Sequence, residues 1–205
     1  METSSQAETQ ASAAMSTLNG QLREIYGRAA YTQKTHEKMA DDCTIKYQRI
    51  KRLEIVLSAI TSGSLLIAVF GDSGTGTIIG AVLSTILLGV TLYFKEASLG
   101  EQAQKHATVA SKLWGVREAL LSLLVDMQDG RAKDEVRTER DRLNGLLEEI
   151  YRSAPRTDRA AYVAAQQALK QDEELFFSDR ELNRMLPARL RAGAISTSVK
   201  GNPAA

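Results

Sequence analysis

The chain has 205 residues with 26 basic and 25 acidic side chains, and its formal net charge of +1 excludes a global field that would attract nucleic acid. Its single cysteine excludes an internal disulfide and a CxxC metal site, and its length fits one domain or a small domain with attachments. Abundant alanine, leucine, arginine, glutamate and glutamine with only three prolines favour an all-α fold.

Residues 1–16 are small and polar, without the basic and apolar regions of a signal peptide, and we predict that they are disordered. From residue 17 onward, apolar and small side chains recur in steps of four and three, as in a heptad seam. No proline or glycine interrupts 28–62, so we predict one long helix that continues into the first apolar segment. The seam consists of Leu18, Leu22, Ile25, Ala29, Thr32, His36, Met39, Cys43, Lys46, Ile50, Leu53 and Leu57.

Two apolar segments, 53–70 and 77–94, are each long enough as a helix to span about 27 Å, close to the hydrocarbon thickness of a bilayer. Glu54 is the only charge in either, and Tyr93 and Phe94 give the second an aromatic end that is typical of a membrane interface. The pattern predicts an integral membrane two-helix hairpin. The alternative is a pair of buried helices in a soluble bundle.

The glycine-rich stretch between the two segments, 71–76, has the glycine spacing of a phosphate-binding loop. That loop requires a lysine and a hydroxyl after its last glycine, and this chain has Thr77 and Ile78 there. We therefore interpret the glycines as the turn of the membrane hairpin.

The charges that flank the segments predict the orientation. The turn has no basic residue and one acidic residue, Asp72, whereas basic residues cluster at the other ends. By the positive-inside rule both termini are cytoplasmic, and we predict a multi-pass membrane protein; a reduced Cys43 agrees with this side. The basic residues are Lys46, Arg49, Lys51 and Arg52 before the hairpin and Lys95 and Lys105 after it.

Two faces of the predicted spans are candidates for function. Small residues that permit close helix packing in lipid are Gly63, Gly80, Ser84 and Gly89. Polar residues at spacing i, i+4, i+7 and i+8, which we predict to line a pore with the carboxylate at its cytoplasmic mouth, are Glu54, Ser58, Thr61 and Ser62. The alternative is that the hydroxyls bond carbonyls of their own helix and Glu54 pairs with Arg49, Lys51 or Arg52.

A second seam follows the second span and predicts a continuous helix antiparallel to the first. His36 lies 17 residues before the first span and His106 lies 12 residues after the second, so we expect the two rings at different depths, each satisfied by hydrogen bonds. We predict no catalytic, metal or cofactor site and no enzyme activity. The seam consists of Leu99, Ala103, His106, Ala110, Leu113, Arg117, Leu120, Leu124 and Met127.

Three further helices are predicted toward the C-terminus. The first, 132–153, ends at Pro155, and Thr157 or Asp158 caps the second, which runs to about residue 171. Ser178 and Glu181 form a capping box for a short helix that Pro187 stops, and 191–205 reads as a disordered tail. The predicted apolar face of the first of these helices is Val136, Leu143, Leu146, Leu147 and Ile150.

The stretches "IYGRAAYTQKTHEKMAD", "KHATVASKLWGVREALLSLL" and "EELFFSDRELNRMLP", on either side of a tight two-span hairpin, resemble the SLATT family of bacterial membrane proteins. The resemblance implies a domain at 17–190, with spans at 53–70 and 77–94 and a cytoplasmic bundle formed by 17–52 and 95–190. It implies structural or interface roles for Tyr31, Lys34, Thr35, His36, His106, Trp114, Phe177, Ser178, Asp179, Leu186 and Pro187.

The resemblance also implies the function. Members are effectors of bacterial defence loci beside nucleotide-second-messenger synthases or sensor domains, and they are thought to permeabilise the membrane and kill the infected cell. We therefore predict a homo-oligomeric pore-forming or membrane-disrupting effector, signalled by a nucleotide second messenger or by a sensor protein in trans. The alternatives are a non-conducting membrane-anchored scaffold that recruits a partner through its bundle, and a soluble helical protein.

Overall fold

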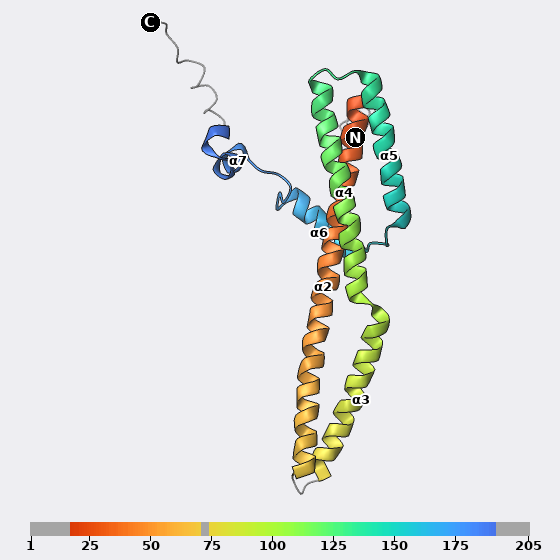
Figure 1. Ribbon diagram of the computed structural model, residues 1–205, viewed down its shortest axis with the longest axis vertical. Helices are drawn as coiled ribbons and strands as arrows, with labels where there is room; N and C mark the ends of the chain where they lie inside the picture. Colours follow the sequence, from red (N-terminus) through yellow and green to blue (C-terminus); the bar gives the residue numbers. More distant parts are fainter. Residues whose placement is uncertain (1–16, 71–73, 192–205) are drawn as a thin grey trace, which may run out of the picture. The chain divides into compact units, whose positions relative to one another are not determined.

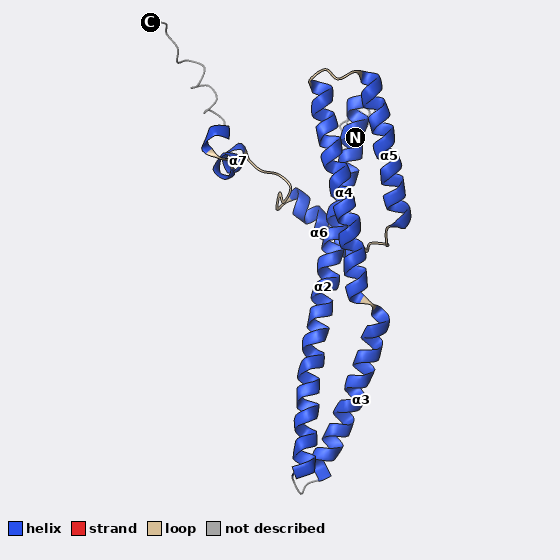
Figure 2. Cartoon of the chain, in the orientation of Figure 1, coloured by secondary structure: helices blue, strands red, loops and turns tan. Residues whose placement is uncertain are grey.

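The computed structural model describes residues 17–70 and 74–191, and within these ranges the chain forms helices and connecting loops with no strand (Figures 1 and 2). This confirms the all-α prediction. The predicted disorder of 1–16 and of the tail from 192, and residues 71–73 of the predicted turn, fall outside the described residues. The chain divides into two compact units, 1–165 and 166–205, which are described separately.

The first long helix, α2 (Leu18–Phe70), is continuous, as predicted. The absence of glycine and proline from 28–62 leaves its backbone hydrogen bonds uninterrupted. Ion pairs at i,i+4 spacing support its exposed side, between Arg28 and Glu24 at 3.9 Å and between Lys46 and Asp42 at 2.6 Å. One helix thus carries both the bundle seam and the apolar segment 53–70.

The prediction of a second continuous helix is wrong at Ser98. The chain forms α3 (Gly74–Ala97) and α4 (Leu99–Gln128), and Ser98 between them has φ 43° and ψ 38°, in the left-handed region. The side chain of Gln102 donates a hydrogen bond of 2.8 Å to the carbonyl of Ala97, which partly compensates for the interrupted helical bonding. A Cβ on Gly100 would lie 3.7 Å from the Tyr47 ring, an ordinary contact distance, so the start of α4 lies against Tyr47 of α2.

The core of the first unit lies among α2, α4 and α5 (Lys133–Ser153), which run side by side in Figure 1. Gly130, with φ 97°, turns the chain between α4 and α5. Of the predicted α5 face all but Leu146 is buried; Leu146 is 37% exposed. The core consists of Leu22, Ile25, Ala29, Val109, Leu113, Val116, Leu120, Leu123, Val136, Leu143, Leu147 and Ile150.

The last helices have the predicted signals at their ends. Asp158 rather than Thr157 caps α6 (Arg159–Lys170), because its Oδ1 accepts a 2.7 Å hydrogen bond from the amide of Ala161. In the second unit, Ser178 and Glu181 form the predicted capping box at the start of α7 (Asp179–Met185). Pro187 follows the end of α7 and precedes a short 3₁₀ helix, Ala188–Leu190.

Candidate functional site

The apolar segments of α2 and α3 leave most of their large side chains uncovered. Among the described residues, one helical stretch, Gly76–Gln128, is long and apolar enough to cross a membrane, and 6% of its apolar window is buried. Core helices of a soluble bundle would show the opposite pattern, because contiguous apolar surface normally has a partner. The exposed side chains are Leu53, Ile55, Val56, Ile60, Leu65, Leu66, Ile67, Ile78, Ile79, Val82, Ile86, Leu88, Leu92 and Tyr93.

The candidate packing residues lie in two different settings. Gly80 is buried where α3 meets α2, and a Cβ there would stand 3.0 Å from the Ser64 Oγ and 3.4 Å from the Leu65 side chain. A Cβ on Gly63 or Gly89 would meet none of the described residues within 4 Å. Ser84 is also exposed. Gly80 therefore serves the α2–α3 contact, Ser84 and Gly89 lie on the exposed surface of α3, and Gly63 is half-buried.

The predicted pore-lining residues divide in a similar way. Thr61 is buried and its hydroxyl donates to the carbonyl of Leu57 at 2.8 Å. Glu54 is half-buried and pairs with Lys51 at 3.1 Å. Both contacts agree with the alternative to a pore lining, in which these polar groups form hydrogen bonds and ion pairs within their own helix. Ser58 and Ser62 are exposed.

His36 and His106 meet in the bundle, which corrects the prediction that they lie at different depths. Their Nδ1 atoms are 2.8 Å apart and their ring centroids 5.0 Å apart. The prediction measured depth from the edges of the apolar segments, but the hairpin pairs its helices outward from the turn. His36 lies 34 residues before Phe70 and His106 lies 32 residues after Gly74, so the two rings are almost level. The predicted satisfaction by hydrogen bonding is confirmed.

The histidine pair is buried and shares one hydrogen bond, so one Nδ1 donates and the other accepts. Burial, and secondarily the charge of His106, lowers the pKa of His36 to about 4. Burial also lowers the pKa of His106, with Asp158 opposing the shift. The pair is therefore neutral near pH 7, and within 17–70 and 74–191 no three His, Cys, Asp or Glu side chains are grouped to hold a metal ion.

A second polar contact beside the histidines was not predicted. Arg117 Nη1 donates a 3.0 Å hydrogen bond to Oε1 of buried Gln33 and thereby joins α4 to α2. The sequence feature that could have indicated this contact is Arg117, because a guanidinium on a core seam needs a hydrogen-bond acceptor on the facing helix. Gln33 lies one position beside the predicted seam, so the seam did not reveal it.

The remaining family-motif residues lie on α4 and around α7. Trp114 is 53% exposed on α4, in the first unit. In the second unit Ser178 is the N-cap of α7, Asp179 is its first residue and Pro187 follows its end.

The first unit thus defines a class of protein: a helical hairpin with uncovered apolar surface whose helices continue into a packed bundle containing buried polar pairs. The model of the SMODS and SLOG-associating 2TM effector domain family 4 matches residues 18–181. The chain therefore belongs to this SLATT family, whose domain is a two-transmembrane (2TM) membrane effector domain of defence systems. No curated protein and no solved structure matches the chain.

Proposed function

We propose that the protein is a bacterial inner-membrane effector of an antiphage defence system that oligomerises on receiving a signal, opens a pore or disrupts the bilayer, and so causes abortive infection. The proposal rests mainly on the uncovered apolar surface of α3. In its most apolar stretch, which is long enough to span a membrane, 6% is buried. Lipid is the solvent for such a surface. Membership of an effector family supports the same conclusion.

The proposed topology has two spans, 53–70 and 77–94, with the bundle and both termini in the cytoplasm. Basic residues lie where each apolar segment meets the bundle, as the positive-inside rule requires. They are Arg49, Lys51 and Arg52 on α2 and Lys95 at the end of α3. The exposed apolar side chains of α2 between Leu53 and Ile67 support the first span.

Pore formation requires several copies, because two helices do not enclose a water-filled path. A Cβ on Gly63 or Gly89 would meet no described residue within 4 Å, and Ser84 is exposed; such small residues permit close approach of a second copy in lipid. Ser58 and Ser62 are exposed on α2 and would face the interior of the oligomer. The signal, a nucleotide second messenger or a sensor protein in trans, would act on the cytoplasmic bundle.

Dye release from vesicles tests the proposal. Purified protein in vesicles of bacterial lipids should release an entrapped dye as the protein-to-lipid ratio rises, because mass action then replaces the signal. Ser58→Leu with Ser62→Leu should abolish release without loss of membrane binding, whereas Ser122→Leu on the exposed side of α4 should not. Vesicles that stay tight at every ratio and with an activating lysate would refute the pore.

A second candidate function is a non-conducting membrane-anchored scaffold, and exposed Trp114 on the bundle favours it, because tryptophan is enriched at recognition sites. In that case Trp114→Ala should abolish phage defence and the two serine substitutions should leave it intact. Loss of defence on substitution of the serines alone, at normal expression, would exclude the scaffold.

A further inference from the structure

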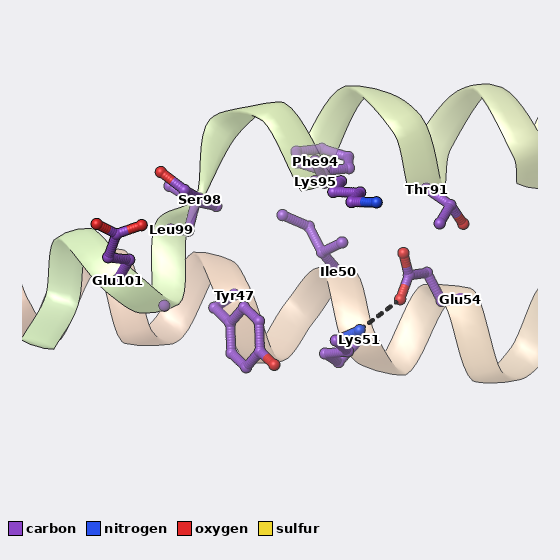
Figure 3. A pocket seen from close by; sticks show the side chains of 11 residues that line it. Tyr47, Ile50, Lys51, Glu54, Thr91, Phe94, Lys95, Ser98, Leu99 and Glu101 are labelled. Atoms are coloured by element: carbon purple, nitrogen blue, oxygen red, sulfur yellow. Dashed lines mark hydrogen bonds and ion pairs between the residues drawn. The ribbon is translucent and has the colours of Figure 1, made fainter.

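A cavity of about 380 Å³ lies between α2 and the junction of α3 with α4, where the apolar surface of the hairpin ends (Figure 3). The break at Ser98 shapes it, because the chain leaves the α3 helix there and α4 then packs against α2 next to Tyr47. The side chains used below are Tyr47, Ile50, Lys51, Glu54, Phe94 and Lys95.

The charges in this cavity do not balance. The carboxylate of Glu54 pairs with Lys51 at 3.1 Å. The side chain of Lys95 extends into the same space in Figure 3, and its ammonium has no hydrogen-bond or ion-pair partner among the residues described. Glu101, at the far end, does not compensate for it, because its carboxylate pairs with Lys105 at 2.7 Å. The cavity therefore presents one ammonium group that an anion would complement.

The rest of the cavity is apolar and continues onto the uncovered surface of the hairpin. Ile50 and Phe94 lie beside the ammonium of Lys95 (Figure 3), and the exposed side chains of Leu53 and Leu92 lie next on the two helices. A ligand that fits needs a phosphate-like anionic head and a long apolar body. A small water-soluble anion would satisfy Lys95 but would leave this apolar surface uncovered.

We propose that this cavity binds the headgroup of an anionic phospholipid, with its phosphodiester on Lys95 and its acyl chains along the exposed surfaces of α2 and α3. Lys51 stays paired with Glu54, so Lys95 supplies the positive charge. The inference rests on the proposed insertion of the hairpin into a membrane. It adds a specific lipid site at the junction through which bundle and hairpin are joined.

Native mass spectrometry from nanodiscs tests the site. The full chain is inserted into discs of equal parts phosphatidylglycerol and phosphatidylcholine with matched acyl chains, and the ratio of retained lipids is measured. The wild type should retain phosphatidylglycerol and phosphatidylcholine in a ratio of about five to one, against one to one in the disc, since one basic group near the surface has about this effect. Lys95→Gln should remove the enrichment and Lys95→Arg should keep it. The matched control, Arg52→Gln, removes an exposed basic residue next to Lys51 that does not line the cavity, and it should change nothing.

Each other result overturns the inference in a distinct way. An equal loss with Arg52→Gln would show general charge attraction, and the absence of enrichment in the folded wild type would show that the ammonium of Lys95 contacts only solvent. Displacement of phosphatidylglycerol by excess inorganic phosphate, with a phosphate adduct retained, would assign the cavity to a free anion. These three outcomes leave membrane insertion standing, whereas failure of the chain to enter the discs at all would remove the proposed function as well. Helicity by circular dichroism checks that Lys95→Gln remains folded.

Discussion

At the scale of single residues, the histidine pair gives the bundle a defined dependence on pH. Only one proton fits between the two Nδ1 atoms at 2.8 Å, so protonation of both rings would place two buried imidazolium groups against each other. Near the pair, Asp158 raises the pKa of His106. Burial, then Asp42 and to a smaller extent Asp158, raises the pKa of Cys43. Burial outweighs Asp158, because the pKa of both histidines falls.

We expect the bundle to lose stability as the pH falls from about 6.5 to about 4. The unfolded chain takes up a proton at His36 near the ordinary pKa of 6.5, whereas the folded chain resists it until about pH 4. The cost reaches about 3 kcal/mol at the lower limit, and it is absent above pH 7. Thermal unfolding in detergent, followed by circular dichroism at a series of pH values, measures it. His36→Gln should flatten the dependence in this window, and an unchanged slope in that variant would contradict the assignment.

Ser98 is the residue whose backbone conformation creates the α3–α4 junction. An L-residue in the left-handed region loses about 1–2 kcal/mol relative to helix, and glycine does not. Ser98→Gly should therefore leave stability unchanged or raise it by up to about 1 kcal/mol, and Ser98→Val should lower it by more than about 1 kcal/mol. Apparent melting temperatures in detergent provide the comparison. The control is Ser122→Gly inside α4, which should destabilise by about 0.5 kcal/mol. Destabilisation by glycine at both sites would mean that Ser98 is helical in solution.

At the scale of elements, the contact between α2 and α3 depends on one glycine. A side chain on Gly80 would collide with Ser64 at 3.0 Å, whereas a side chain on Gly89 meets no described neighbour within 4 Å. We expect Gly80→Leu to separate the hairpin helices and to lower the apparent stability by about 1–3 kcal/mol. Gly89→Leu should leave the stability of the monomer unchanged and should weaken oligomers in cross-linking experiments if α3 is an interface between copies. Equal melting temperatures for wild type and Gly80→Leu would refute the close contact.

Most helices could be predicted from the sequence because their signals are local. The glycine- and proline-free stretch of α2, the capping box at Ser178 and the apolar face of α5 each depend on neighbours within a few residues. The break at Ser98 has no such signal, since serine is acceptable within a helix and nothing around it is a strong breaker except Gly100. It accompanies a tertiary contact, the approach of Gly100 to Tyr47.

The candidate site shows the same division between local and tertiary information. The sequence gives the apolar segments and the candidate polar residues, but it does not say which of them face α3 and which face outward. The histidine pair was missed because its register depends on where the helices reverse, and the apolar edges at 53 and 94 are not equally far from the turn. Counting outward from the turn would have placed His36 and His106 level.

At the scale of the whole molecule, the uncovered apolar surface should hold the protein in the membrane against extraction with alkaline carbonate. Val82 and Ile86 are 54% and 49% exposed, one helical turn apart in the middle of α3. A lysine at the centre of a span costs about 2.5–3.5 kcal/mol, so Val82→Lys with Ile86→Lys should transfer much of the protein to the soluble fraction or to inclusion bodies. Leu121→Lys is the control, because Leu121 is 44% exposed on α4 of the bundle, where water is its expected surrounding. A wild-type chain that appears folded in the carbonate supernatant would contradict the membrane assignment, since its apolar surface would then have to be covered by protein instead of lipid.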